Sequence, residues 1–470
     1  MTDFLEKTFR LKEHQTDVRT EILAGITTFM TMAYILAVNP GILSAAGMDA
    51  GAVFTATALG ACLGTLLMAL FSNYPFALAP GMGLNAFFAY TVVGQMGYSW
   101  QVALAAVFVE GILFIVLSLT KVREALFNSI PPALKFGVTS GIGLFITFIG
   151  LQNSKLVVAG PTLVGLYPFK AALADGTFWS TGIGALLALI GILLTAVMMT
   201  KKVPGGILVG ILVTWGLGMI CELTGIYVPN PKLGMFSVMP SFANGISVPS
   251  LAPTFMQLDF SAIFTFNFIT IMLSFMFVDL FDTLGTLIGV ASKAKMLDKD
   301  GKLPKIEGAL LADSIATTGG ALLGTSTVTT FVESSAGVAV GGRTGLTAVT
   351  AAVLFFLSLF FAPIFLAIPA FATAPALVIV GFLMVSSLLN VDFDDMTEAI
   401  PAFVAAVAMP FMYSISEGIS MGVISYVAIN LLSGEYKNKK TSWIVYVLAV
   451  IFILNVNCKN KLHIFPNQAE

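Results

Sequence analysis

The chain has 470 residues, of which 57% are hydrophobic and only 10% are charged, and its formal net charge is −2. Soluble domains carry about a quarter of their residues as charged side chains, so this composition excludes a soluble globular protein and indicates a chain that lies mostly in lipid. The net charge identifies no partner, and we expect no nucleic acid among the partners.

The N-terminal residues 1–20 are charged and contain no apolar run, which indicates a cytoplasmic tail or a short interfacial helix rather than a signal peptide. The three cysteines, Cys62, Cys221 and Cys458, are far apart and form no pair motif, so we expect free thiols. Both histidines, His14 and His463, lie in the predicted tails. The predicted membrane part therefore offers no imidazole to a metal ion, and we expect no metal and no cofactor other than a coupling proton.

A spanning helix needs about 20 apolar residues, and the sequence predicts fourteen such segments, two of them irregular. Residues 443–454 form a final apolar run of about 12 residues, which is short for a span. We expect an interfacial helix there. The fourteen predicted spans are 21–38, 52–72, 76–95, 102–120, 133–152, 178–199, 205–223, 262–290, 306–324, 327–340, 346–368, 374–389, 398–413 and 417–434.

The positive charges orient these spans. With the N-terminus inside, 18 Lys and Arg residues lie on the predicted inner side and three, Lys155, Lys170 and Lys232, lie on the outer side. Cytoplasmic loops carry an excess of such residues, so the sequence predicts a multi-pass protein of the inner (cytoplasmic) membrane with a cytoplasmic N-terminus. The predicted inner loop 390–397 is acidic, and acidic residues count little in this rule.

Segments in the first half of the chain also resemble segments in the second half. Residues 130–145 resemble 372–387, and residues 203–220 resemble 414–432. Because seven spans per copy is an odd number, the second copy would be inverted, as in many secondary transporters. Chance similarity between helices rich in small residues is the alternative.

Two segments do not match a simple helix. Residues 74–90 contain Pro75, Pro80, Gly81 and Gly83, and residues 324–345 start with a Thr/Val run and end near a Gly-Gly pair. Each predicts a short extended stretch followed by a half-helix. Such backbone is tolerated at membrane depth only where it is buried in protein or lines a cavity, and paired segments of this kind mark transporter binding sites. A packing kink is the structural alternative.

Carboxylates at membrane depth are the candidate site residues. Asp279 and Asp282 are three residues apart and so share a helix face, while Glu333 and Asn85 take corresponding places in the two irregular segments. A carboxylate at the bilayer centre costs about 2.5–3.5 kcal/mol, which favours a functional role for Asp279 and Glu333. For Asp282 a local hydrogen-bonding role remains open.

Other acidic residues are expected to be structural. We interpret Glu110 as a structural partner of Arg343 or as part of a backbone break. Asp313 and Glu417 are expected near span ends, where polar atoms reach water. With no histidine in the spans, proton coupling would have to protonate a carboxylate, with Asp282 and Glu333 as the candidates. Buried acids suit a flat heterocycle that offers both donors and acceptors, and they would repel a bare anion.

Several stretches carry a family resemblance. TEILAGITTFMTMAYILAVNP (20–40), ALAPGMGLNAFFAY (77–90), FVDLFDTLGTLIGVA (277–291) and the block 311–349 resemble the AzgA-like branch of the nucleobase–cation symporter family. Members of this branch are proton-coupled permeases for adenine, guanine and hypoxanthine. The match runs from about residue 4 to about residue 455, and we find no departure at these motifs.

The resemblance implies an all-α fold with 14 transmembrane segments in a 7+7 inverted repeat, with strand and half-helix segments in spans 3 and 10. A core domain (21–120 and 260–370) would move against a gate domain (121–225 and 371–435), flanked by the tail 1–20 and the C-terminal region 436–470. The substrate acids of the family fall on Asp279 and Glu333, and the span-3 asparagine falls on Asn85. Phe331 stands at the position of an aromatic residue that lies beside the base in relatives. Relatives of this fold are often homodimers.

We therefore expect proton-coupled uptake of purine bases, with hypoxanthine and guanine favoured and adenine possible. Backbone amides near Phe331 and Thr330 would complete the polar contacts. The alternatives are an anion transporter of the same fold, of the sulfate-permease type, and a passive channel. An integral-membrane enzyme would need a metal or nucleophile cluster that the predicted spans lack.

Overall fold

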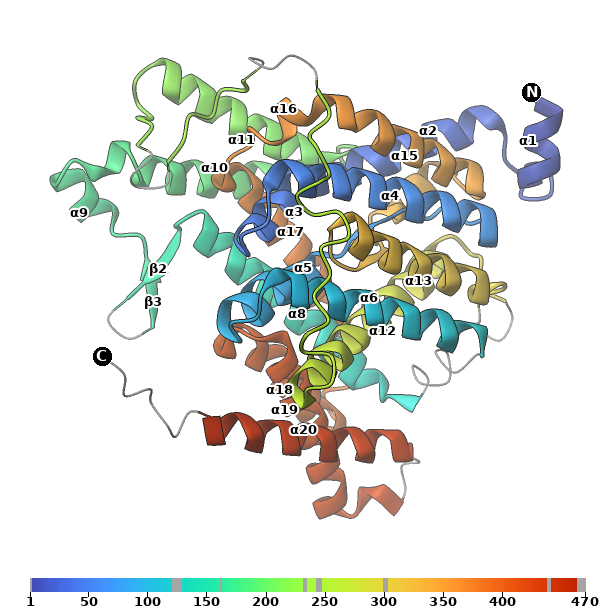
Figure 1. The fold of residues 1–470 in the computed structure, drawn as a ribbon. Coiled ribbons are helices and arrows are strands. Elements are labelled where there is room, and N and C mark those ends of the chain that lie inside the picture. The colour runs from blue at the N-terminus through green and yellow to red at the C-terminus, as the bar shows by residue number, and fades with distance from the viewer. Residues whose placement is uncertain are drawn as a thin grey trace.

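The computed structural model describes residues 2–120, 129–160, 163–230, 235–241, 247–298, 303–437 and 441–462. Within these ranges, ten helices are long and apolar enough to cross a membrane. They pack side by side in a bundle, with α1 at one end and the β2–β3 hairpin at the other (Figure 1). The chain is a helical membrane protein.

Every predicted span overlaps helices or strands of the structure. The first half contains α1 (Thr2–Phe9), α2 (Val18–Met32), α3 (Ile35–Ser44), α4 (Ala50–Ser72), β1 (Leu78–Pro80), α5 (Met82–Ala86), the π-helix η1 (Phe87–Gln95), α6 (Trp100–Leu119), α8 (Pro132–Asn153), β2 (Val157–Ala159), β3 (Val164–Leu166), α9 (Phe169–Ala174), η2 (Thr177–Trp179), α10 (Gly182–Thr200) and α11 (Gly206–Leu223).

The second half contains α12 (Phe266–Lys293), α13 (Ile306–Leu323), β4 (Val328–Thr330), α14 (Ser334–Val340), α15 (Gly345–Ser358), η4 (Leu359–Phe361), α16 (Ala362–Phe365), α17 (Ala370–Val385), η5 (Ser386–Asn390), α18 (Met396–Met412), α19 (Ile415–Ser433), η6 (Glu435–Lys437) and α20 (Trp443–Leu462). Helix α20 has 20 residues rather than the expected 12 or so. It packs against α19 (Figure 1), and its expected interfacial position stays a prediction.

Two short strands meet in the middle of the bundle. β1 and β4 pair in an antiparallel register that sets Leu78 opposite Thr330. The pairing continues beyond the strands, because Gly81 N donates to Thr327 O at 3.0 Å and Phe331 N donates to Ala77 O at 3.0 Å. The predicted strand and half-helix segments are confirmed, and each strand satisfies backbone groups that the other would leave unpaired in lipid.

The helices form two sets of close neighbours. In the first set, α13 packs on α4 and α6, and α15 packs on α2 and α4. In the second set, α8 packs on α17 and α18, and α10 packs on α11 and α17. Glycines let α8 and α17 approach closely, since a Cβ on Gly143 would lie 2.6 Å from Gly381 O. The self-similar segments 130–145 and 372–387 are therefore direct neighbours.

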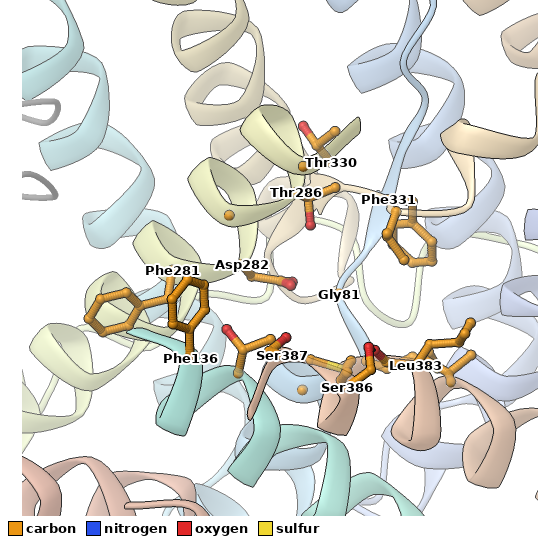
Figure 2. A pocket seen from close by; sticks show the side chains of 18 of the residues that line it. Gly81, Phe136, Phe281, Asp282, Thr286, Thr330, Phe331, Leu383, Ser386 and Ser387 are labelled. Atoms are coloured by element: carbon orange, nitrogen blue, oxygen red, sulfur yellow. The ribbon is translucent and has the colours of Figure 1, made fainter. Parts of the chain in front are cut away.

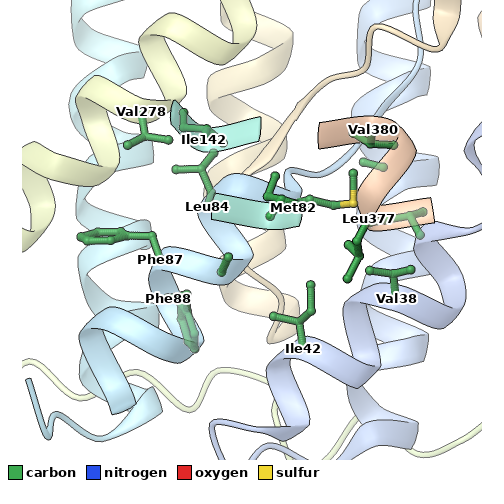
Figure 3. Packing of buried hydrophobic residues seen from close by; sticks show 14 of the residues in the cluster. Val38, Ile42, Met82, Leu84, Phe87, Phe88, Ile142, Val278, Leu377 and Val380 are labelled. Carbon is green, nitrogen blue, oxygen red and sulfur yellow. The ribbon is translucent and has the colours of Figure 1, made fainter. Parts of the chain in front are cut away.

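Helix α5 lies between these two sets. Its Met82 and Leu84 are buried and belong to one apolar cluster, which also contains Val38 and Ile42 of α3, Ile142 of α8, and Leu377 and Val380 of α17 (Figure 3). Gly83 keeps α5 close to α8, because a Cβ there would lie 2.5 Å from Ile142 Cγ2. The start of α5 is thus fixed beside the end of β1.

The ends of the chain are only partly described. Phe9 and Leu11 are buried against Leu346, so the N-terminal region contacts the bundle. The tail from His463 to the C-terminus and the segment 121–128, where the predicted gate domain begins, lie outside the described residues. Cys62 and Cys221 are free thiols, as expected.

Candidate functional site

The two strand ends border a cavity of about 570 Å³ in the centre of the bundle. Its walls come from α8, α12 and α17, together with the start of α5, the β4–α14 connection and η5 (Figure 2). The residues that line the cavity include Tyr34, Gly81, Met82, Lys135, Phe136, Phe281, Asp282, Gly285, Thr286, Gly289, Thr330, Phe331, Glu333, Ser386, Ser387 and Asn390. A volume of this size lies in the range of small-molecule sites.

Asp282 is the carboxyl group that α12 contributes to this cavity. Asp282, Gly285, Thr286 and Gly289 all line the cavity and follow the spacing of one helix face. The two glycines leave room in front of the carboxyl group, which projects toward the open centre in Figure 2. Thr329 Oγ1 donates to Asp282 Oδ2 at 3.2 Å, so β4 fixes this side chain.

Glu333 is the second carboxyl group of the cavity, and only 8% of its surface is exposed. It directly precedes α14. Tyr34 OH donates to Glu333 Oε1 at 2.6 Å, and Thr31 Oγ1 lies 3.4 Å from Glu333 O. The break between α2 and α3 brings Tyr34 to this position.

Phe331 and Thr330 also line the cavity, as predicted. The amide of Phe331 donates to Ala77 O, so this N–H is engaged within the protein, and the expected contacts from backbone amides near Phe331 and Thr330 stay a prediction. The hydroxyl of Thr330 has no hydrogen-bond partner within the described part of the chain, although the residue is 1% exposed. A buried hydroxyl without a partner costs about 1–3 kcal/mol, so Thr330 is well suited to a polar ligand.

Asp279 does not line the cavity. It is fully buried on α12, where Thr283 Oγ1 lies 3.0 Å from Asp279 Oδ1 and 2.8 Å from Asp313 Oδ1. One hydroxyl proton serves one acceptor at a time, so these two carboxyl groups compete for the hydroxyl of Thr283. Asp313 is fully buried in the middle of α13, and the expectation that it sits near a span end is wrong.

Asn85 lies behind the cavity wall. It is fully buried, its Oδ1 accepts from Ser326 Oγ, and its Nδ2 lies 3.4 Å from Pro80 O. Asn85 thus ties α5 to the segment that enters β4. Of the predicted substrate contacts, the structure brings together Glu333, Phe331 and Thr330 with Asp282, and it leaves Asp279 and Asn85 one layer further back.

The pairing expected between Glu110 and Arg343 is not the arrangement observed. Arg343 Nη1 donates to Val338 O and to Gly342 O, at 2.7 Å each. Thr327 Oγ1 lies 3.4 Å from Glu110 Oε2.

The sequence reasoning missed several lining residues. Tyr34 lies inside the predicted span 21–38, and no glycine or proline near it signals the break between α2 and α3. Lys135 offered a signal, because a cation inside a predicted span points to a functional site. Ser386 and Ser387 belong to η5, a 3₁₀ turn that the apolar pattern of the second half did not indicate.

The cavity combines two carboxyl groups, hydroxyl groups and the aromatic side chains Phe136, Phe281 and Phe331. Such a site can hydrogen-bond the edge of a flat, polar ring and contact its faces. In the described ranges, no cluster of three or more His, Cys, Asp or Glu residues could hold a metal ion.

Fold and cavity together define a polytopic membrane transporter, with discontinuous segments that meet at a central site. The sequence comparisons agree. A model of the Permease family matches residues 19–421. The chain belongs to this permease family.

Curated relatives match almost the whole chain. A putative permease of Methanocaldococcus jannaschii is 52% identical over 96% of this chain and 98% of its own. The adenine permease AdeP of Escherichia coli is 44% identical, with 96% of each chain covered. The guanine/hypoxanthine permease PbuG of Bacillus subtilis is 45% identical, over 95% of this chain and 98% of its own. These relatives are named as transporters rather than enzymes.

Solved structures share the fold. The transmembrane domain of the cyanobacterial bicarbonate transporter BicA superimposes with a TM-score of 0.62 at 18% identity, over 86% of this chain and 97% of that chain. The murine anion transporter Slc26a9, in its inward-facing state, gives a TM-score of 0.60 at 12% identity, over 89% and 68% of the two chains.

Proposed function

We propose that this protein carries purine nucleobases across the cytoplasmic membrane, with hypoxanthine and guanine favoured and adenine possible. The main observation behind this proposal is the central cavity, which is lined by Asp282, Glu333 and Thr330. Within the described residues, the hydroxyl of Thr330 has no hydrogen-bond partner. Support for the ligand class comes from full-length relatives that are named adenine permeases and guanine/hypoxanthine permeases.

The purine would lie between the start of α5 and the start of α14. Glu333 and Asp282 would hydrogen-bond its ring edge, Thr330 would add a hydroxyl contact, and Phe331 would lie beside its face. Asp279 and Asn85, the sequence-based candidates outside the cavity, would position α12 and α5.

A proton is the proposed coupling ion. Desolvation favours the neutral form of a carboxyl group, and a protonated carboxyl group can donate to a ring nitrogen or carbonyl oxygen. Asp282 or Glu333 would take up the proton together with the base. No other cofactor is part of the proposal.

The architecture proposed for this cycle is the 14-span, 7+7 inverted repeat with its core and gate domains. The antiparallel pairing of β1 with β4 supports it, because corresponding segments of two inverted copies would meet in this way. Lys135 and Asn390 line the cavity near the predicted inner face, which favours an inward-open state. We place the N-terminus in the cytoplasm, from the charge distribution, and include a homodimer in the proposal.

Anion transport and passive conduction are not favoured. Two carboxyl groups in the cavity would repel a bare anion, and the likeness to the anion transporters extends to the fold alone. A passive channel would show neither saturation nor dependence on a gradient.

Uptake of radiolabelled hypoxanthine, guanine and adenine by cells that lack their own purine permeases tests the proposal. We expect saturable uptake that an uncoupler abolishes and that Glu333→Gln and Asp282→Asn each reduce at least about tenfold, as expected for the loss of a charge-assisted hydrogen bond. Uptake of none of the three bases would overturn the ligand class. Uptake that persists with the uncoupler would overturn proton coupling, and wild-type uptake by both variants would overturn the site.

A further inference from the structure

A second cavity lies at the end of the bundle that the charge distribution assigns to the cytoplasm. Its volume is about 390 Å³, and it shares no lining residue with the central cavity. We call it the basic cavity and define it by its lining residues Glu13, His14, Gln15, Ser72, Asn73, Tyr74, Ala294, Lys295, Met296, Pro304, Lys305 and Arg343.

The charge of the basic cavity is predominantly positive. Lys295, Lys305 and Arg343 are the basic side chains with long, flexible or forked cationic groups here, and Glu13 is the one carboxylate among the lining residues. Glu13 Oε2 lies 3.6 Å from Arg10 Nη1, so its charge is compensated outside the lining. Three cations that converge on one concave surface attract an anion, and Arg and Lys together suit phosphate oxygens.

A buried donor supplies independent support. Tyr74 lines the basic cavity with 5% of its surface exposed, and in the described part of the chain its hydroxyl has no hydrogen-bond partner. A buried hydroxyl usually finds a partner. An anionic oxygen in the cavity would provide the missing acceptor.

The remaining walls are less polar. Ala294, Met296 and Pro304 border the cations, and the volume lies in the range that holds a whole small molecule rather than a bare ion. We propose that the basic cavity binds a phosphate-bearing ligand, either a soluble phosphate ester or the headgroup of an anionic phospholipid. This site is separate from the proposed substrate site and does not depend on which solute is transported.

The cations of the basic cavity come from the ends of different helices, which a bound phosphate would connect. Arg343 follows α14, and its backbone N–H donates to Glu21 Oε1 of α2 at 2.9 Å. Lys295 follows α12 and Lys305 precedes α13. A phosphate held by these side chains would link the ends of α12, α13 and α14. Asp282 lies on α12, Asp313 lies on α13, and Glu333 directly precedes α14. The bound phosphate would stabilise the folded protein by mass action.

Binding of glycerol 3-phosphate to the full-length protein in phosphate-free detergent solution tests the proposal, with glycerol as the uncharged comparison. A second arm compares the thermal unfolding midpoint in nanodiscs of phosphatidylcholine alone with that in nanodiscs that also contain phosphatidylglycerol. Neither probe contains a purine, so the central cavity does not contribute to the result.

We expect the double variant Lys295→Gln/Lys305→Gln to lose at least about tenfold in affinity, and Tyr74→Phe to lose about threefold, as befits charged and neutral hydrogen bonds. The matched control Lys201→Gln/Lys202→Gln removes the same charge from the exposed end of α10, outside the cavity, and should bind as the wild type does. Gel filtration of each variant checks that it is folded.

The two arms separate the sources of phosphate. Binding of glycerol 3-phosphate supports a soluble ester, whereas stabilisation by phosphatidylglycerol alone supports a headgroup, in each case if the Lys295→Gln/Lys305→Gln variant loses the effect. The proposal is overturned if neither probe acts on the wild type, or if the double variant responds as the wild type does.

Discussion

The phenol of Tyr34 donates a 2.6 Å hydrogen bond to Oε1 of Glu333, and both side chains line the central cavity. The two residues are 299 positions apart. The carboxyl group that precedes the second half-helix is therefore oriented by a helix break in the first tenth of the chain.

Removal of this phenol should weaken substrate binding. Tyr34→Phe keeps the ring and deletes the donor, and loss of a hydrogen bond to a charged group costs about 1.5–3 kcal/mol. We expect the apparent affinity for the transported base to fall about tenfold or more, measured as the KM of uptake. Tyr90→Phe is the matched control, because Tyr90 bonds to Asn153 and does not line the cavity. Equal KM values for both variants would contradict the orienting role.

A methyl group at Gly81 should displace the side chain of Asp282 from its position in the cavity. A Cβ there would lie 2.8 Å from Thr329 Oγ1 and 3.3 Å from Asp282 Oδ2, the two atoms of the hydrogen bond that fixes Asp282. We expect Gly81→Ala to reduce uptake severalfold while the protein still reaches the membrane. Gly41→Ala, where a Cβ would meet no atom within 4 Å, should transport normally. Unchanged uptake by Gly81→Ala would show that the cavity tolerates the shift.

The hydroxyl shared by Asp279 and Asp313 should matter for stability. Thr283→Val preserves the shape of the side chain and removes the donor from two fully buried carboxyl groups. Loss of a buried hydrogen-bond partner costs about 1–3 kcal/mol, so we expect a lower thermal unfolding midpoint for the purified protein. Thr283→Ser retains the hydroxyl and should recover most of the loss. Identical thermal unfolding midpoints for Thr283→Val and Thr283→Ser would argue against a stabilising role for the Thr283 hydroxyl.

Glu21 should stabilise the start of α15. Its carboxylate accepts from the backbone N–H groups of Arg343 at 2.9 Å and Thr347 at 3.1 Å, and from the hydroxyl of Thr347 at 2.6 Å. Since helix N-termini leave N–H groups unsatisfied, Glu21→Ala should lower the unfolding free energy by about 1–3 kcal/mol. Glu21→Gln keeps one acceptor oxygen and should lose less. The measurement is the thermal unfolding midpoint of the purified protein. A higher midpoint for Glu21→Ala than for Glu21→Gln would contradict the role of Glu21 at the start of α15.

The sequence predicted the long helices and the strands β1 and β4, because apolar length and Gly/Pro placement are local signals, but it did not predict the β2–β3 hairpin. It favoured Asp279 over Asp282 as the substrate contact, whereas Asp282 is the one of the two that lines the cavity. Residues three apart on a helix point about 60° from one another, and which of them meets the cavity depends on how α12 is rotated against β4. Thr329 fixes that rotation through its bond to Asp282, and Gly285 and Gly289 open the same face.

Contacts between segments that are distant in the chain also could not be predicted from the sequence. Asp313 shares the hydroxyl of Thr283 from a neighbouring helix, and Asn85 accepts from Ser326 across the two halves of the chain. Neither partner is close in sequence. By contrast, Glu333 was found because the Thr/Val run before it already indicated an irregular segment, and such segments line cavities. Phe331 was found through the family resemblance.

The pairing of β1 with β4 has a consequence for how the protein is made. The amide of Ala77 donates to Ser334 Oγ, a partner 257 residues further along the chain. While the ribosome is still producing the second half, the polar edge of β1 has no strand beside it, and hydrocarbon cannot solvate such an edge. The first half must therefore keep this segment out of lipid during synthesis, and the central cavity closes late, only when the tenth predicted span arrives.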